Sequence, residues 1–105
     1  MTLPNPNEPI RLLLVEDDPE SGAAMNMAIE RKGISCDLAV DMDGAIAKFA
    51  RNEFDAVTVD VRLGDDNGLD FLEHVRRRNS DVPVLVITAY SDIGPVVRAL
   101  KLGAQ

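Results

Sequence analysis

Acidic residues follow directly after two apolar runs of the chain, and a threonine ends a third such run. The residues concerned are Glu16, Asp17, Asp18, Asp60 and Thr88. Carboxylates that lie together repel one another and raise each other's pKa, and a hard divalent cation removes that penalty. Mg²⁺ prefers oxygen ligands and takes one or two carboxylates together with phosphate oxygens. These residue types therefore indicate a site for Mg²⁺ and phosphate chemistry, provided that the fold brings them together.

Asp17 and Asp60, together with a backbone carbonyl, would suit such an ion. The cation would screen the charge of an incoming phosphodonor and orient Asp60 for in-line attack. The hydroxyl of Thr88 could donate a hydrogen bond to a phosphoryl oxygen. Any one of these residues alone is as well explained by a solvated loop. Their shared place at the ends of apolar runs favours the site.

The elements that must position these residues alternate along the chain. Apolar, β-branched runs predict strands at residues 10–15, 35–40, 56–61 and 82–88. Helices are predicted to begin near Pro19, near Asp41 or Asp43, at Gly68 and near Ser91 or Asp92. This alternation predicts an α/β fold, a doubly wound parallel sheet with helices on both faces. In such sheets chemistry gathers at the carboxyl ends of the strands, where the candidate residues stand.

Helix ends and buried faces can also be predicted. Asp18 suits the N-cap of the first helix, and Gly33 suits the position just after its end. The second helix is expected to bury Ala45, Ile46, Phe49 and Ala50. The third helix, at residues 68–78, is expected to turn Leu69, Leu72 and Val75 inward. The strands at 10–15, 56–61 and 82–88 are expected to be buried.

Composition limits the class of protein. The chain has 105 residues, 46% apolar and 28% charged, which is typical of one globular domain. Residues 1–9, with three prolines, are predicted to be a disordered leader, and residues 10–105 the domain. The net charge of −7 argues against direct nucleic-acid binding. No apolar run is long enough to span a membrane and no signal peptide opens the chain, so we expect a cytoplasmic protein.

Three motifs give the chain a family resemblance. They are LLLVEDD at 12–18, VTVDVRLGDDNGLD at 57–70 and VITAY at 86–90. Together they resemble the receiver domain of two-component response regulators, and ALKLGA at 99–104 is similar to the end of that family's fourth helix. The likeness covers about residues 10–103. It implies a flavodoxin-like fold and a signalling domain, not an enzyme, that takes a phosphoryl group from a sensor histidine kinase or a phosphotransfer protein.

The resemblance also implies roles for individual residues. Asp60 would be the phosphoacceptor, and Thr88 the hydroxyl that shifts toward the phosphoryl group. Asp17 would bind Mg²⁺ together with Asp18, or with Glu16 through water. Arg62 would contact the ion through its backbone carbonyl.

The chain departs from the family pattern in two places. Gly64 stands where the family commonly has a proline, which allows a positive φ in the loop after Asp60. The sequence ends at Gln105, before the family's fifth strand, its lysine and its fifth helix. We therefore expect an incomplete receiver domain with weakened phosphorylation. We also expect a possible homodimer through the edge of the strand at 82–88 or the face of the fourth helix.

Two other functions are compatible with these residues. One is a phosphorylation-independent interaction or dimerisation module on a degenerate receiver fold, which the missing lysine favours. The other is a Mg²⁺-dependent phosphatase of the haloacid dehalogenase type, which also uses a strand-end aspartate. That family needs a second acid two residues after the nucleophile, and Arg62 stands there instead. The phosphoacceptor is the leading hypothesis.

Overall fold

A computed structural model describes residues 9–78 and 81–87 of the chain. Its elements are β1 (Arg11–Val15), α1 (Pro19–Arg31), β2 (Ser35–Ala39), α2 (Met42–Arg51), β3 (Ala56–Asp60), β4 (Arg62–Leu63), β5 (Asp66–Asn67), α3 (Gly68–Arg77) and β6 (Val84–Ile87). Most of the predicted leader, Thr88 and the predicted fourth helix lie outside the described residues. In the described part, no helix is long and apolar enough to cross a membrane.

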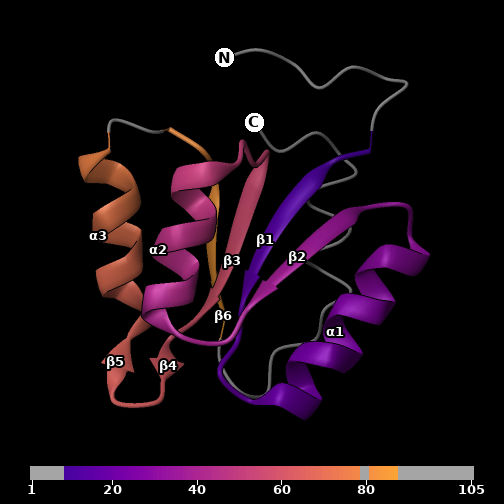
Figure 1. Cartoon of the computed structure of the whole chain (residues 1–105), viewed down its shortest axis with the longest axis horizontal. Helices are drawn as coiled ribbons and strands as arrows, with labels where there is room; N and C mark the ends of the chain where they lie inside the picture. The colour runs from indigo at the N-terminus through magenta and orange to yellow at the C-terminus, as the bar shows by residue number, and fades with distance from the viewer. Residues whose placement is uncertain (1–8, 79–80, 88–105) are drawn as a thin grey trace.

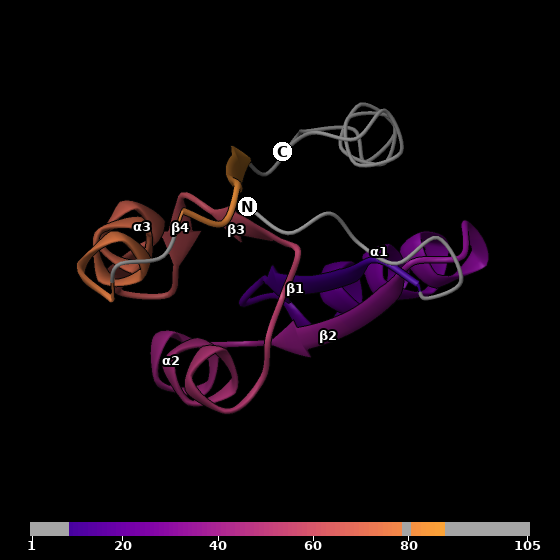
Figure 2. The ribbon, with the colours of Figure 1, turned by 90° about the horizontal axis from the view of Figure 1, so that it is seen from above.

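The main sheet has four parallel strands in the order β2-β1-β3-β6. Helix α1 lies on one side of it, and α2 and α3 lie on the other (Figures 1 and 2). This arrangement confirms the predicted α/β fold with a doubly wound parallel sheet. It also makes β1, β3 and β6 neighbours, so that the carboxyl ends of β1 and β3 meet at one edge of the sheet.

Two clusters of apolar side chains hold the layers together. The cluster on the side of α2 and α3 comprises Leu13, Val15, Ala39, Ala45, Val57, Val59, Leu63, Phe71, Val75 and Val82. The cluster on the side of α1 comprises Leu12, Leu14, Ile29, Ile34, Ala56 and Ile87. Because β1 and β3 contribute to both clusters, they are buried on both faces, as their continuous apolar sequence predicts.

The predicted ends of α1 are confirmed. Asp18 is the N-cap, and its carboxylate accepts a hydrogen bond from the amide of Ser21. Gly33 follows the helix with a φ of 84°, which glycine adopts without a steric penalty. Of the two alternatives for α2, Asp41 is the N-cap and accepts from the amide of Gly44 at 2.6 Å.

Two buried faces differ from the prediction. Leu69 was expected to turn inward but is 47% exposed, and Phe71 is fully buried instead. The first residue of α3, Gly68, is itself buried, so the residues that follow it at helical spacing, Phe71 and Val75, share its face and Leu69 does not. In α2, Ala50 is exposed.

The strands are also shorter than predicted. Ile10, Val40 and Val61 lie outside the strands that they were expected to extend. Strand β6 begins at Val84 instead of Val82, and its predicted last residue, Thr88, lies outside the described residues. The strand is not fully buried, with Val86 37% exposed, because it lies at the edge of the described sheet. The segment after Asp60, expected to be a loop, contains an antiparallel hairpin made by β4 and β5.

Candidate functional site

Three carboxylates lie together at the carboxyl ends of β1 and β3. They belong to Glu16, Asp17 and Asp60, and one oxygen of each lies within 4.8 Å of the others. The pairing of Val15 with Val59 brings the two strand ends side by side. The amide of Glu16 donates to the carbonyl of Ala39, which fixes the chain as it leaves β1. The sheet therefore produces the convergence of acids that the sequence predicts.

Two of these three acids are buried. Glu16 and Asp60 are each 6% exposed. Burial raises the pKa of Glu16 to about 7, and the neighbouring Asp60 side chain adds to the rise through its hydrogen bond and its charge. A raised carboxylate pKa means that the surroundings oppose a negative charge on the group. A bound cation would reverse this effect and favour the charged carboxylate.

Asp17 connects the cluster to the hairpin. Its Oδ2 accepts a hydrogen bond from the amide of Gly64 at 2.9 Å. Gly64 has a φ of 60°, which agrees with the positive φ that its sequence position allows, and Leu63 beside it is buried in the core. Strands β4 and β5 are thereby held next to the carboxyl ends of β1 and β3, as Figure 1 shows.

The end of β3 is held by contacts on both sides of Asp60. Its Oδ1 accepts from the amide of Arg62 at 3.0 Å. The amide of Val61 donates to the carbonyl of Ile87 at 2.9 Å, and the amide of Gly68 donates to the carbonyl of Val61 at 2.7 Å. Arg62 therefore touches Asp60 through its amide, and a contact of its carbonyl with an ion stays a prediction.

Asp18 is placed differently from its neighbours. Its Oδ2 accepts from the amide and, at 2.6 Å, from the hydroxyl of Ser21, and these hydrogen bonds lower the pKa of Asp18. Its carboxylate is not part of the group of three, whereas that of Glu16 is. The sequence contained a signal for this difference, because an acid directly before Pro19 is a typical N-cap. Thr88 lies outside the described residues.

The donor set fits Mg²⁺. The three side chains offer only carboxylate oxygens, the ligands that hard divalent cations prefer. A cation would also offset the cost of holding the buried Glu16 and Asp60 near each other as anions. Asp17 and Asp60, with Glu16, could hold the ion, which would neutralise charge on an incoming anionic group.

Sequence comparisons identify the family. Residues 12–105 match the model of the response regulator receiver domain. The acid tolerance regulatory protein ActR of Sinorhizobium medicae is 37% identical over 93 residues, which cover 89% of this chain and 48% of ActR. The chain thus spans about half the length of this relative.

Solved structures agree. The receiver domain of HemR from Leptospira biflexa is 33% identical, with a TM-score of 0.71 over 90% of this chain and 76% of that one. A response regulator protein from Burkholderia pseudomallei, solved with a phosphorylated aspartic acid and a calcium ion, is 29% identical, with a TM-score of 0.72 over 90% of this chain and 55% of that one. The chain therefore belongs to the family of response regulator receiver domains, the signalling domains of two-component systems.

Proposed function

We propose that this chain accepts a phosphoryl group on Asp60 with the help of Mg²⁺. The observation that carries the proposal is the group of three carboxylates, Glu16, Asp17 and Asp60, at the carboxyl ends of two adjacent parallel strands. The phosphorylated aspartic acid and calcium ion in the Burkholderia pseudomallei protein support the same chemistry on a similar fold. Glu16, not Asp18, is the better candidate for the third carboxylate, because Asp18 binds Ser21.

In this proposal a carboxylate oxygen of Asp60 attacks the phosphorus atom of a phosphohistidine. The new bond is an acyl phosphate. The phosphorus–nitrogen bond breaks, and its electron pair leaves with the imidazole. The amide of Arg62 holds Oδ1 of Asp60, which leaves the other oxygen to attack. Mg²⁺ would supply charge neutralisation during the transfer.

Other parts of the proposal complete the site and its setting. The backbone carbonyl of Arg62 would complete the set of oxygen ligands, and Thr88 would donate its hydroxyl to the phosphoryl group. The donor would be a sensor histidine kinase or a phosphotransfer protein, the partners of this family, in the cytoplasm. A DNA-binding role is not part of the proposal, because the chain carries a net charge of −7.

The test is phosphorylation by acetyl phosphate with Mg²⁺, read by intact mass. The expected result is an adduct of one phosphoryl group that is lost in Asp60→Asn. Asp55→Asn is the matched control, because Asp55 is an exposed acid that precedes the same strand and accepts a hydrogen bond from the amide of Arg11. If neither wild type nor control is modified while both stay folded, the proposal is wrong.

The second candidate function is a phosphorylation-independent interaction module. It is favoured by β6, which has one strand neighbour in the described sheet and carries the 37% exposed Val86. Such an edge can pair with a second copy of the chain. Light scattering decides: a mass that rises with protein concentration in the absence of phosphodonor supports this function, and a constant monomer mass contradicts it.

A further inference from the structure

The first turn of α3 lies directly against the peptide group of Asp60. Gly68, the first residue of the helix, is buried, and its amide donates to the carbonyl of Val61 at 2.7 Å. A Cβ atom added to Gly68 would overlap the carbonyl oxygen of Asp60 and would lie 2.9 Å from its carbonyl carbon. Glycine is therefore required at this position by lack of space.

The neighbour of Gly68 is backbone that cannot easily give way. Asp60 pairs with Ile87 of β6, and the amide of Val61 donates to the carbonyl of Ile87 at 2.9 Å. Gly22 in α1 offers a contrast, because a Cβ there would meet the end of the Leu38 side chain at 3.0 Å, and a side chain can change its rotamer. A side chain at position 68 would have to displace either the backbone of Asp60 or the whole first turn of α3.

Asn67 fixes this first turn. It is the N-cap of α3, and its Oδ1 accepts from the amide of Leu69 at 2.9 Å. Asn67 also ends β5, which pairs with Arg62 of β4, the residue whose amide holds the Asp60 carboxylate. The start of α3 therefore contacts Asp60 directly through Gly68. It is also linked to Asp60 indirectly, because Asn67 pairs with Arg62 and the amide of Arg62 donates to the Asp60 carboxylate.

The geometry points to Gly68 and Asn67 as positioning residues for Asp60: close contact of the first turn of α3 with the Asp60 peptide sets the place of its carboxylate. This inference rests on the proposed function of Asp60. In-line transfer depends on the alignment of the attacking oxygen, and a misplacement of about 1 Å can cost about a hundredfold in rate.

The test compares phosphorylation rates with acetyl phosphate at saturating Mg²⁺. Gly68→Ala is expected to slow the reaction about tenfold to a hundredfold. Asn67→Ala, which removes the cap without adding a clash, is expected to slow it about threefold or more. Asp41→Ala is the matched control, because it removes the equivalent cap from α2, a helix whose first turn does not hold Asp60. It is expected to lower the melting temperature as Asn67→Ala does, with the rate within about twofold of wild type.

Equal rates for Asn67→Ala and Asp41→Ala would overturn the inference, even if Gly68→Ala fails to fold. So would a folded Gly68→Ala with the wild-type rate. The NMR signals of the Asp60 amide and carboxyl carbon give a readout without phosphodonor. They are expected to shift in Asn67→Ala and to stay in place in Asp41→Ala. If wild type accepts no phosphoryl group, the proposed function fails, and these signals still decide whether α3 positions Asp60.

Discussion

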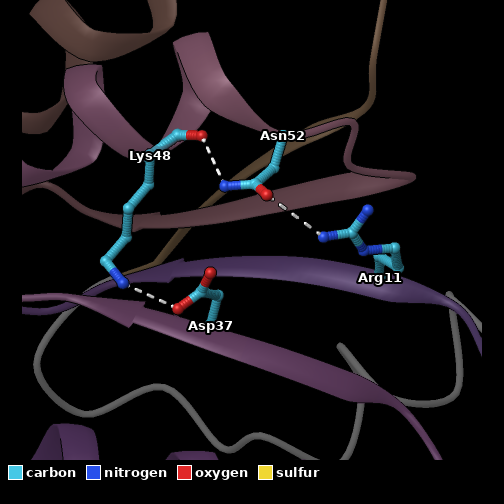
Figure 3. A network of polar contacts seen from close by, with 4 residues as sticks. All are labelled: Arg11, Asp37, Lys48 and Asn52. Carbon is cyan, nitrogen blue, oxygen red and sulfur yellow. Dashed lines mark hydrogen bonds and ion pairs between the residues drawn. The ribbon is translucent and has the colours of Figure 1, made fainter.

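Two groups of charged residues in this molecule differ in how their charges are balanced. The acid cluster, Glu16, Asp17 and Asp60, gathers like charges, two of them buried. The polar network on the α2 side of β1 and β2 joins each charged or polar group to a hydrogen-bond or ion-pair partner (Figure 3). It comprises Arg11, Asp37, Lys48 and Asn52. Within it, Lys48 and Asp37 form an ion pair of 2.7 Å whose side chains are 38% and 41% exposed.

The difference shows which group depends on a ligand. In the polar network each charge or dipole finds a partner inside the chain, and water screens what is left. Neither the Lys48–Asp37 pair nor the Arg77–Glu73 pair includes a residue of the acid cluster. Burying like charges lowers the stability of a protein when no cationic side chain lies beside them. A bound cation removes that cost. The acid cluster is therefore the group whose balance is expected to depend on Mg²⁺.

The most direct effect is expected on Mg²⁺ affinity. Asp17→Asn is expected to weaken Mg²⁺ binding by about tenfold or more, because it removes an anionic ligand while leaving an oxygen to accept from the amide of Gly64. Asp37→Asn removes the same charge from the polar network and is expected to leave the affinity unchanged. Titration calorimetry gives both values. Equal losses in the two variants would show that Mg²⁺ responds only to net charge and would remove the distinction between the two groups.

The next effect concerns the stability of the metal-free protein as pH rises. The pKa of Glu16 is raised in the folded state from 4.5 to about 7, so folding is favoured when this group is protonated. That contribution is fully present below about pH 4.5 and is lost as pH rises through about 7. The full loss is on the order of 3 kcal/mol.

Urea unfolding with a chelator at pH 5 and pH 8 measures this contribution. Glu16→Gln has no proton to lose at this position. The free energy of unfolding of the variant minus that of wild type is therefore expected to be larger at pH 8 than at pH 5. Asp37→Asn serves as the control, and its difference from wild type is expected to stay constant. A constant difference for Glu16→Gln as well would contradict the account of the acid cluster.

The sequence predicted much of the fold because many signals are local. The apolar runs of β1 and β3, the cap at Asp18 and the positive φ at Gly33 each depend on residues close by in the chain. The convergence of Asp17 and Asp60 followed from a general rule about parallel strands. The buried face of α3 could not be predicted in the same way, because it is set by contact of Gly68 with Asp60.

The third carboxylate of the acid cluster was left open between Asp18 and Glu16, although the N-cap signal of Asp18 before Pro19 favours Glu16. Three consecutive acids follow β1, and which of them faces Asp60 depends on where α1 begins. The hairpin of β4 and β5 was missed because strands of two residues have no periodicity to detect. Its contact with the site runs from Asp17 to Gly64, residues 47 positions apart, and no local pattern encodes it.

A smaller effect is expected at Thr58, two residues before Asp60. This side chain is buried, and among the described residues its hydroxyl has no hydrogen-bond partner. Thr58→Val replaces the hydroxyl by a methyl group of similar size and is expected to stabilise the protein by about 1 kcal/mol. Urea unfolding measures the change. A loss of stability would mean that the hydroxyl is bonded in solution, for example to a buried water molecule.

The smallest effect is expected in the polar network. The Lys48–Asp37 pair is short, but both side chains are more than a third exposed, so water screens their attraction. A double-mutant cycle with Lys48→Met and Asp37→Asn is expected to give a coupling of about 0.2–1 kcal/mol that falls as salt is added. Both single variants are expected to keep the wild-type Mg²⁺ affinity. A coupling well above this range would mean that the network is as sensitive to charge as the acid cluster. The two groups would then differ in whether their neighbouring charges are alike or opposite, and not in how deeply the charges are buried.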